Sequence, residues 1–390
     1  MTLERKKKLA FVTTSFPTDF DGQEAAGTFA YDLALSLAKG ADVTVIAPAV
    51  ARVQAGSGRT FPFELAYFPV KSLPLSQLNP LNPFDWWRIG DAIRKGEECT
   101  ESLARAKGFD HLLCLWALPS GFWGYKMFKK FGIPYSVWVL GSDLWTGSRI
   151  PLVRRVLKRV LKSSRACLAD GPSLVQAGER LSGRSFLFTP SARKLEVKDT
   201  TPPKDKPPYR LAFLGRWHVH KGADLLCEAL KGLANEDWKK IERVRFAGGG
   251  PLEREVRESL ATLQGAGYPV SVEGFKNKEE AMELLKWADY VLIPSRRDSI
   301  PVIFSDAMQC RSPVVVNPVG DLPFVVGKFG VGLISESVSA RAFAEALARA
   351  LASCPASFDK GLREAASFFD VEEIGRQVLL ATGMSAETVS

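Results

Sequence analysis

Two aspartates in the second half of the chain have side chains that can bind a diol. Asp298 lies in a loop that is predicted to follow the apolar run 290–293, and Asp306 lies in a short helix that Pro301 opens. A second apolar run, 313–316, follows, so the pattern predicts a strand, a loop, a helix and a strand. Each carboxylate can accept hydrogen bonds from vicinal hydroxyl groups, which ribose and hexose rings present.

The start of that helix is a place where a phosphate can bind. In an open parallel sheet, the loop that leaves the carboxyl end of a strand faces the ligand crevice, and the next helix begins there with unpaired N–H groups. Val302 and Ile303 occupy this position, directly after Ser299 and the rest of the loop. A sugar nucleotide offers both diols and phosphates, so its chemistry fits the whole segment.

An earlier loop supplies positive charge. A predicted strand, 209–214, is followed by Gly215 and Arg216 and then by Lys221 and Gly222 before another helix. An arginine can bind a diphosphate through two parallel hydrogen bonds, and a lysine adds a point charge, so no metal is needed.

These segments together resemble the signature of the retaining GT-B glycosyltransferases of glycosyltransferase family 4, also called group 1, which includes sucrose and mannosyl transferases. In that family a Glu, seven residues and a second Glu precede Ala-Met and a Pro-Val-Val strand; this chain has the spacing, Ala307-Met308 and 313–316, with Asp298 and Asp306 as the acids. Each acid is one methylene shorter than in the family. The family also has a Gly-Arg followed by Lys-Gly at the donor diphosphate, as at 215–222.

The resemblance implies roles for these residues. Arg216 and Lys221 would stabilise the diphosphate and Asp298 would hold the sugar hydroxyls, which makes these three the expected catalytic residues, while Asp306 would bind the ribose diol. The expected donor-binding set is Gly27, Gly215, Arg216, Lys221, Gly249, Gly250, Gly274, Phe275, Asp298, Ser299, Val302, Ile303 and Asp306. The glycines can equally be turn residues, and Phe275 can equally be a core residue.

A third segment matches the family on the acceptor or sugar side. Gly141, Ser142 and Asp143 stand where the family has His-Gly-Ser-Asp, and Leu140 stands where that His would hold the donor sugar. The turn is therefore expected to be kept, while Leu140 cannot form the hydrogen bond that the His would donate to the sugar.

The order of elements indicates an α/β protein with two Rossmann-like, doubly wound domains that face each other across a cleft, and the resemblance implies the GT-B fold. We expect an acceptor domain at 1–195, a linker at 196–208 and a donor domain at 209–370. Residues 371–390 are expected to form a helix that crosses back to the first domain.

Composition adds limits on partners and compartment. The chain of 390 residues has a formal net charge of +9, and its basic excess lies in the first half. Six cysteines without a CxxC pair indicate buried thiols in a reducing compartment, and no apolar run is long enough to span a membrane. A cytoplasmic location is expected, with peripheral contact to the inner face of the membrane as an option. Nucleic acid is not an expected partner, because no motif supports it.

The basic residues between 149 and 165 lie opposite apolar residues at helical spacing. Such a helix either lies on anionic lipid or is a core helix with a solvated basic face. Trp86 and Trp87 could stack on a sugar ring or on a lipid, although packing in the core is the expectation for both.

No cofactor and no metal site are expected. His218 and His220 lie in one loop, but a third ligand is not apparent, since His111 is the only other histidine.

The leading hypothesis is therefore the retaining, metal-independent transfer of a hexose from a nucleoside diphosphate sugar to a saccharide or lipid-linked acceptor, in envelope polysaccharide or glycolipid synthesis. The alternative is a GT-B regulatory subunit that binds a nucleotide sugar without transferring it. The two shortened acids and Leu140 favour this alternative.

Overall fold

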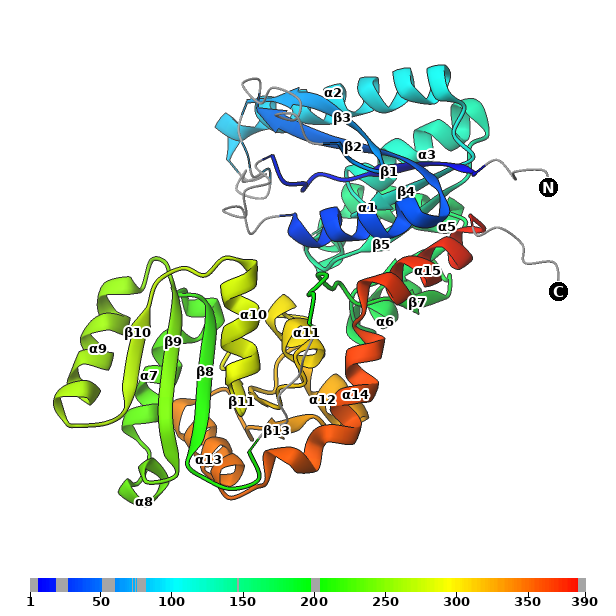
Figure 1. Cartoon of the computed structure of the whole chain (residues 1–390). Helices are drawn as coiled ribbons and strands as arrows, with labels where there is room; N and C mark the ends of the chain where they lie inside the picture. Colours follow the sequence, from blue (N-terminus) through cyan, green and yellow to red (C-terminus); the bar gives the residue numbers. More distant parts are fainter. Residues whose placement is uncertain are drawn as a thin grey trace. The chain divides into compact units, whose positions relative to one another are not determined.

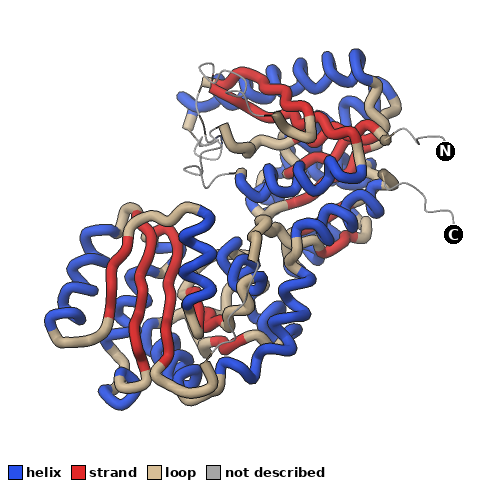
Figure 2. The backbone as a smooth tube through the Cα atoms, in the orientation of Figure 1, coloured by secondary structure: helices blue, strands red, loops and turns tan. Residues whose placement is uncertain are grey.

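The computed structural model of the chain describes residues 6–18, 27–50, 60–71, 73, 75, 82–145, 147–197 and 204–384. Two compact units make up the chain: the first unit is Met1–Pro190 with Val371–Ser390, and the second unit is Ser191–Asp370. Each unit is a parallel sheet with helices on its faces (Figures 1 and 2).

The sheet of the first unit has, in the described residues, seven parallel strands in the order β3-β2-β1-β4-β5-β6-β7. The strands are β1 (Lys8–Val12), β2 (Asp42–Val50), β3 (Glu64–Val70), β4 (His111–Leu115), β5 (Tyr135–Val139), β6 (Cys167–Ala169) and β7 (Phe186–Phe188). All residues of β4 and β5 are buried, as expected for central strands that helices cover on both faces.

Helices cover both faces of this sheet. Right-handed crossovers place α1 on the face opposite to α3, because β2 lies on one side of β1 and β5 lies beyond β4 on the other. The helices are α1 (Thr28–Gly40), α2 (Pro83–Lys107), α3 (Ser120–Phe131), α4 (Ser142–Trp145), α5 (Pro151–Ser163), α6 (Pro172–Ser182) and α15 (Val371–Thr382), with a 3-10 turn η2 (Gly147–Arg149).

The sheet of the second unit has six parallel strands in the order β10-β9-β8-β11-β12-β13, and all its residues are described. The strands are β8 (Tyr209–Arg216), β9 (Ile241–Gly249), β10 (Val270–Glu273), β11 (Tyr290–Ile293), β12 (Val314–Val316) and β13 (Gly332–Ile334). Its large buried side chains include Trp217, Tyr209 and Tyr290.

The helices of the second unit pack in two groups. α7, α9 and α13 share one core with the sheet, while α10, α11, α12 and α14 contact one another in the other group. Their bounds are α7 (Ala223–Lys231), α8 (Asn235–Trp238), α9 (Glu253–Gly265), α10 (Lys278–Trp287), α11 (Val302–Gln309), α12 (Leu322–Phe329), α13 (Ala340–Leu351) and α14 (Asp359–Phe368), with 3-10 turns η3 (Val219–Lys221) and η4 (Pro355–Phe358).

In both sheets the strand order reverses at a defined point, between β1 and β4 and between β8 and β11. Ligands of open α/β sheets bind outside the carboxyl ends of the strands at such a switch point. In the second unit, the loops that leave this point are those after β8 and after β11; Arg216 ends β8, and the two loops hold Lys221 and Asp298.

The C-terminal helix α15 belongs to the first unit, where it packs against α1 (Figure 1). Lys39 of α1 and Glu372 of α15 form an ion pair at 2.5 Å, and Lys7 donates to the carbonyl of Gly383 at 2.9 Å. The change of unit falls between Pro190 and Ser191, a few residues before the linker expected at 196–208, and residues 198–203 of that linker lie outside the described residues.

The expectation that Trp86 and Trp87 pack in the core is wrong. Their exposed fractions are 61% and 50%, and both lie in the first turns of α2. The ammonium of Lys71 lies 4.0 Å from the centre of the Trp87 ring, a cation–π contact.

Candidate functional site

The end of β8 and the loop after it carry the two basic residues that the sequence predicts at a diphosphate. Arg216 is the last residue of β8 and is exposed, and its guanidinium has no ion pair within the described chain. Lys221 ends the 3-10 turn η3, and Gly222 follows in a left-handed conformation at the start of α7. Positive charge therefore lies at the carboxyl edge of the sheet, at its switch point.

The side chain of Lys221 reaches the loop after β11. Its ammonium nitrogen lies 2.7 Å from Oδ1 and 3.0 Å from Oδ2 of Asp298, and the two side chains are 37% and 16% exposed. An ammonium has three N–H donors, and Asp298 accepts two of them here. Two of the three expected catalytic residues, which come from different segments, are thus in direct contact.

Further bonds hold the two loops together. The N–H groups of Arg296 and Arg297 donate to the carbonyl of His220 at 2.8 and 3.3 Å, and the guanidinium of Arg296 forms two 2.7 Å bonds with Asp224 of α7. Burial opposes the ionisation of Asp224, but the bonds and charge of Arg296 outweigh it and lower the pKa of this carboxyl. The loops therefore form one structure rather than two independent segments.

The loop after β11 leads directly into α11. Pro301 precedes the helix, and Val302 and Ile303, its first residues, are partly exposed. The helix start with its unpaired N–H groups thus lies at the same edge as Lys221 and Asp298. This is the placement that the sequence predicts for a phosphate-binding helix start.

Asp306, farther along α11, has a different environment from the one expected. Its side chain is fully buried and forms a two-bond ion pair with Arg193, whose Nε lies 3.3 Å from Oδ1 and whose Nη2 contacts Oδ2. The expected ribose-binding carboxylate is therefore not open to a ligand in this structure.

The glycines at the end of β9 and directly after it differ in whether a side chain could be accommodated. A Cβ on Gly250 would lie 2.7 Å from the carbonyl oxygen of Trp217, and one on Gly248 would lie 1.9 Å from that of Gly215. These two glycines let the β9 turn pack on the β8 loop. A Cβ on Gly249 would meet no atom within 4 Å, so only this glycine borders open space.

The remaining expected donor residues of this unit are spread over neighbouring loops. Phe275 is 65% exposed and follows Gly274, whose carbonyl accepts from Gly248 at 3.1 Å. Ser299 uses its hydroxyl to donate to Asp321 at 2.9 Å, which ties the Asp298 loop to the turn after β12. Phe275 is thus available to a ligand, whereas the Ser299 hydroxyl has a structural partner.

The comparison with known families covers this same region. The sequence model of the family described as Glycosyl transferases group 1 matches residues 208–353, a range that includes both loops and α11. Residues 208–353, within the second unit, are therefore similar to the group 1 glycosyl transferases.

Individual relatives agree with this family. The D-inositol 3-phosphate glycosyltransferase of Corynebacterium aurimucosum is 30% identical over 39% of this chain and 37% of its own length. The putative teichuronic acid biosynthesis glycosyltransferase TuaC of Bacillus subtilis is 28% identical over 60% of this chain and 59% of its own length. The chain thus matches less than two thirds of either relative.

A solved structure gives the fold of the whole chain. Anabaena Alr3699/HepE, crystallised in complex with UDP, has a TM-score of 0.69 over 96% of this chain and 99% of its own, at 15% identity. The predicted GT-B fold, with two Rossmann-like parallel-sheet domains, is confirmed.

The first unit holds the other predicted residues. Gly27 precedes α1 with a φ of 84°, and a Cβ there would lie 2.8 Å from the backbone of Phe16. Gly141 has a φ of 116°, and a Cβ there would lie 2.9 Å from the ring of Trp145. Both glycines are required by local packing, whether or not a ligand binds beside them.

Asp143 is satisfied by backbone groups. Its carboxylate accepts from the N–H groups of Ala117 at 2.8 Å and of Gly141 and Leu144 at 3.1 Å each. Burial raises the pKa of Asp143, although these bonds oppose the shift. Asp143 thus stabilises the turn that begins α4 at Ser142, and its role beside an acceptor or sugar stays a prediction.

Sequence reasoning missed three residues of this candidate site. Arg193 binds Asp306, Arg296 binds Asp224, and Asn317 donates to the carbonyls of Pro294 and Ser295 at 2.9 and 3.3 Å. Arg296, two residues before the motif acid Asp298, could have been noticed as a charge within the motif. Arg193 had no signal, because its partner is more than a hundred residues away in the sequence.

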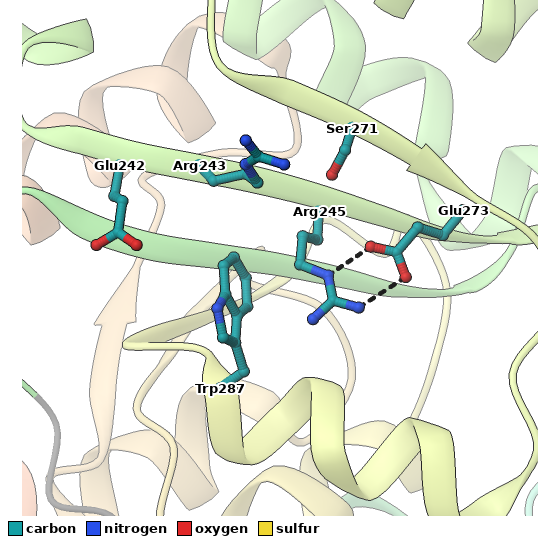
Figure 3. A pocket seen from close by; sticks show the side chains of 6 residues that line it. All are labelled: Glu242, Arg243, Arg245, Ser271, Glu273 and Trp287. Carbon is teal, nitrogen blue, oxygen red and sulfur yellow. Dashed lines mark hydrogen bonds and ion pairs between the residues drawn. The ribbon is translucent and has the colours of Figure 1, made fainter.

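A polar depression on the open face of the β9–β10 edge lies apart from this site. It has a volume of about 530 Å³ and contains none of the expected donor residues; the lining residues are Glu242, Arg243, Arg245, Ser271, Glu273 and Trp287 (Figure 3). Its charges are largely paired, since Arg245 binds Glu273 through two bonds and lies over Trp287. It has the character of a solvated sheet face.

Neither a metal-binding cluster nor a membrane-spanning helix occurs among the described residues. In this part of the chain, no three His, Cys, Asp or Glu side chains converge in a way that could hold a metal ion. Over the same residues, no helix combines the length and the apolar character that crossing a bilayer requires.

Proposed function

We propose that the protein is a retaining glycosyltransferase that transfers a hexose from a nucleoside diphosphate sugar to a saccharide or lipid-linked acceptor. The observation that carries the proposal is the contact between Lys221 and Asp298, because it joins the residue predicted at the diphosphate to the residue predicted at the sugar. The UDP named for the Anabaena structure and the teichuronic acid synthesis named for the B. subtilis relative support a nucleotide donor and a role in envelope polysaccharide or glycolipid synthesis.

Catalysis in this proposal is mainly electrostatic. Negative charge develops on the diphosphate as its bond to the anomeric carbon breaks, and Arg216, Lys221 and the N–H groups at the start of α11 stabilise this charge. Lys221 then shares its donors between the diphosphate and Asp298, which also accepts hydrogen bonds from the sugar hydroxyls.

The acceptor oxygen forms its bond to the anomeric carbon on the face from which the diphosphate departs, and its proton passes to the departing diphosphate oxygen. Because the bond forms on the same face from which the diphosphate departs, the configuration at the anomeric carbon is retained, and no protein nucleophile takes part. Because Arg216 and Lys221 supply the positive charge, the reaction is proposed to proceed without a metal ion and to persist in EDTA.

The experiment has two stages. Thermal-shift screening with UDP-, GDP- and ADP-sugars identifies the donor, since a ligand that binds the folded state raises Tm. Turnover is then followed as release of nucleoside diphosphate on addition of saccharide or lipid-linked acceptors. We expect Arg216→Ala and Lys221→Ala each to weaken donor binding or turnover at least tenfold, or about 1.4 kcal/mol.

A matched control is Lys231→Ala on α7. Lys231 is 36% exposed and pairs with Glu228 at 2.8 Å, so it resembles Lys221 in exposure and pairing but lies away from the switch-point loops. Its removal should leave donor binding unchanged. Unchanged kinetics in either Arg216→Ala or Lys221→Ala would refute the diphosphate assignment.

The alternative function is a subunit that binds the nucleotide sugar without transferring it. It is favoured by the two aspartates of the motif, both of which have basic partners, Asp298 with Lys221 and Asp306 with Arg193. Tight donor binding without release of nucleoside diphosphate, across all acceptors tried, would select this alternative. The Asp298→Asn variant also distinguishes the two functions. If the protein transfers the sugar, this change should reduce turnover more than it reduces donor binding.

We also propose that the first unit contacts an anionic membrane surface through α5. Leu152 at its start is 71% exposed, and the helix has five exposed basic residues with no ion-pair partner in the described chain: Arg154, Arg155, Lys158, Arg159 and Lys162. From residue 144 to residue 169 the sequence contains no acidic residue. Exposed apolar and basic side chains on one helix favour binding at an anionic lipid interface.

A further inference from the structure

The first two turns of α2 extend beyond the core of the first unit. The helix has 25 residues, which makes it about 37 Å long, whereas the central strand β4 has only five residues. Its buried residues recur at every fourth position: Ala92, Gly96, Thr100 and Ala104. This buried row ends at Ala92, because the next position of the same spacing, Arg88, is exposed. No residue from 85 to 91 is buried, so the start of the helix lies outside the core.

Two tryptophans occupy this exposed start. All nine tryptophans of the chain lie in the described residues, and Trp86 and Trp87 are the exposed ones, at 61% and 50%. Burial of two large neighbouring rings against a partner would be favourable. Tryptophan is enriched where membrane and water meet, because its ring is apolar and its N–H group can still bond to water or a lipid headgroup.

The charges beside these rings fit an anionic partner. Lys71 directly follows β3, and its ammonium lies 4.0 Å from the centre of the Trp87 ring; the guanidinium carbon of Arg88 lies 5.9 Å from the same centre. Lys71 is exposed and has no carboxylate partner in the described chain. Arg88 lies 3.9 Å from Asp85, which is long for an ion pair. Basic side chains beside exposed aromatic rings favour binding to anionic lipid.

A bilayer fits this arrangement better than a sugar does. Successive residues of a helix point about 100° apart, so the rings of Trp86 and Trp87 diverge and cannot both stack on one sugar ring. A sugar that stacks on Trp87 would also compete with Lys71, whose ammonium already contacts that ring. The surface of a bilayer is broad enough to accept two diverging rings together with the basic side chains beside them.

The start of α2 lies in the same layer as the basic helix α5. α2, α3 and α5 pack against one core of the first unit, and α3 contacts the other two helices. Each follows a strand of the parallel sheet, so each begins at its carboxyl edge. Packed helices lie 8–10 Å apart, which places the axes of α2 and α5 about 20 Å apart. One flat surface can therefore contact the tryptophans and Leu152 together.

We propose that Trp86 and Trp87 insert into the interface of a bilayer that contains anionic lipid, with Lys71 and Arg88 beside the headgroup phosphates. The inference rests on the proposed membrane contact through α5 and extends it, because the start of α2 supplies aromatic groups that α5 lacks. Two contacts made by one folded unit bind more tightly than either contact alone.

The test uses lipid that carries bromine on its acyl chains, which quenches the emission of a tryptophan that enters the bilayer. The protein is mixed with vesicles of phosphatidylglycerol and either brominated or ordinary phosphatidylcholine. We expect lower emission with the brominated vesicles. Trp86→Phe with Trp87→Phe should abolish most of this difference, because the other seven tryptophans are buried or partly buried and both phenylalanines still bind the interface.

A second variant measures the contribution of the rings to binding. Trp86→Ser with Trp87→Ser should weaken cosedimentation with the same vesicles about tenfold, while the thermal midpoint reports that the protein is folded. The matched control is Phe324→Ser with Val338→Ser in the second unit, where the side chains are 50% and 41% exposed. This control should bind the vesicles as the unaltered protein does.

Cosedimentation without quenching, or quenching that persists in the double phenylalanine variant, would overturn the role of the tryptophans and leave the contact through α5 standing. Failure of the unaltered protein to cosediment at all would overturn both. A change in emission with saccharide acceptors but not with vesicles, lost in the double phenylalanine variant, would make the two rings a sugar site and overturn the inference. None of these outcomes bears on donor binding, which is measured separately.

Discussion

Gly222 is the residue at which the loop after β8 meets the loop after β11. Its φ is +72°, and a Cβ there would lie 2.0 Å from the carbonyl oxygen of Pro294. A side chain at this position must therefore push the two loops apart and adopt an unfavourable backbone conformation. Since Lys221 precedes it directly, its contact with Asp298 depends on this close approach.

We predict that Gly222→Ala destabilises the second unit by about 1–3 kcal/mol and weakens donor binding. Gly249→Ala is the control, because a Cβ there would meet no atom within 4 Å and its backbone is not left-handed. Chemical denaturation of both variants measures the difference. A Gly222→Ala protein as stable as the Gly249→Ala protein would show that the loops can separate at little cost.

Single residues also show where sequence reasoning ends. The spacing of Asp298, Asp306 and Lys221 was enough to predict that they lie near one sheet edge, because strand, loop and helix follow from local pattern. The partner of Asp306 was not predictable. Arg193 approaches α11 only through the folded path of the chain, and no local pattern encodes such a distant pair.

Among the elements, α5 has five exposed basic residues without an ion-pair partner in the described chain. On several other helices basic residues have acidic partners one turn away, such as Arg94 with Glu98 at 2.8 Å and Arg341 with Glu345 at 2.9 Å. No acidic residue lies on α5. An unpaired basic helix is attracted to anionic lipid by about 1 kcal/mol for each basic residue near the surface.

We predict that Arg154, Arg155 and Arg159 changed together to Gln lower cosedimentation with vesicles containing phosphatidylglycerol at least tenfold. The same number of charges removed from the second unit, with Arg254, Arg341 and Lys239 changed to Gln, should have little effect. Binding to uncharged phosphatidylcholine vesicles should be weak for all three proteins. Equal losses in both triple variants would indicate that net charge, and not α5, determines any binding.

At the β9–β10 edge, an ion pair links two neighbouring strands across the polar depression (Figure 3). The bonds from Arg245 hold the pKa of Glu273 at about 2, below its ordinary value of 4.5, and Lys276 adds to this effect. A carboxyl group whose pKa is lower in the folded state than in the unfolded state stabilises the folded state at pH values above its unfolded pKa. This contribution is therefore present above pH 4.5 and is lost as pH falls from 4.5 towards 2.

We predict that Glu273→Gln lowers the free energy of unfolding by about 1 kcal/mol at pH 7, a modest value because both side chains keep contact with solvent. The difference from the unaltered protein should shrink as pH falls below about 4.5. Glu258→Gln, at a side chain that is 69% exposed, should change stability by less than about 0.5 kcal/mol. A difference that stays constant from pH 7 to pH 3 would contradict the ionic origin.

Most of the helices and strands could be predicted from the sequence. Continuous apolar runs such as 111–115 and 135–139 became buried parallel strands, and the glycines and prolines around them marked the loops. Which residues at the start of α2 are buried could not be predicted from the sequence. Trp86 and Trp87 are apolar, which favours burial. The side of a helix that faces the sheet in its first turns is set by the position of the preceding loop, and the local sequence pattern does not give that position.

On the scale of the whole molecule, the chain enters the second unit once and returns to the first. α15 completes the first unit by packing on α1, although more than three hundred residues separate them in sequence. A Cβ on Gly40 of α1 would lie 2.6 Å from the side chain of Leu379, which shows how closely the helices approach. The stability of the first unit therefore includes a contribution from the last helix.

We predict that Leu379→Ala destabilises the first unit by about 2–3 kcal/mol and leaves the second unit unchanged. Leu379 is 7% exposed, whereas the next residue, Leu380, is 51% exposed, so Leu380→Ala is a control of identical chemistry with an expected effect below about 0.5 kcal/mol. Hydrogen exchange resolves the two units, because faster exchange should appear in α1 and the strands it covers and not in β8 or β9. Faster exchange throughout both units would mean that they unfold together, and α15 would then stabilise the whole chain rather than the unit it packs on.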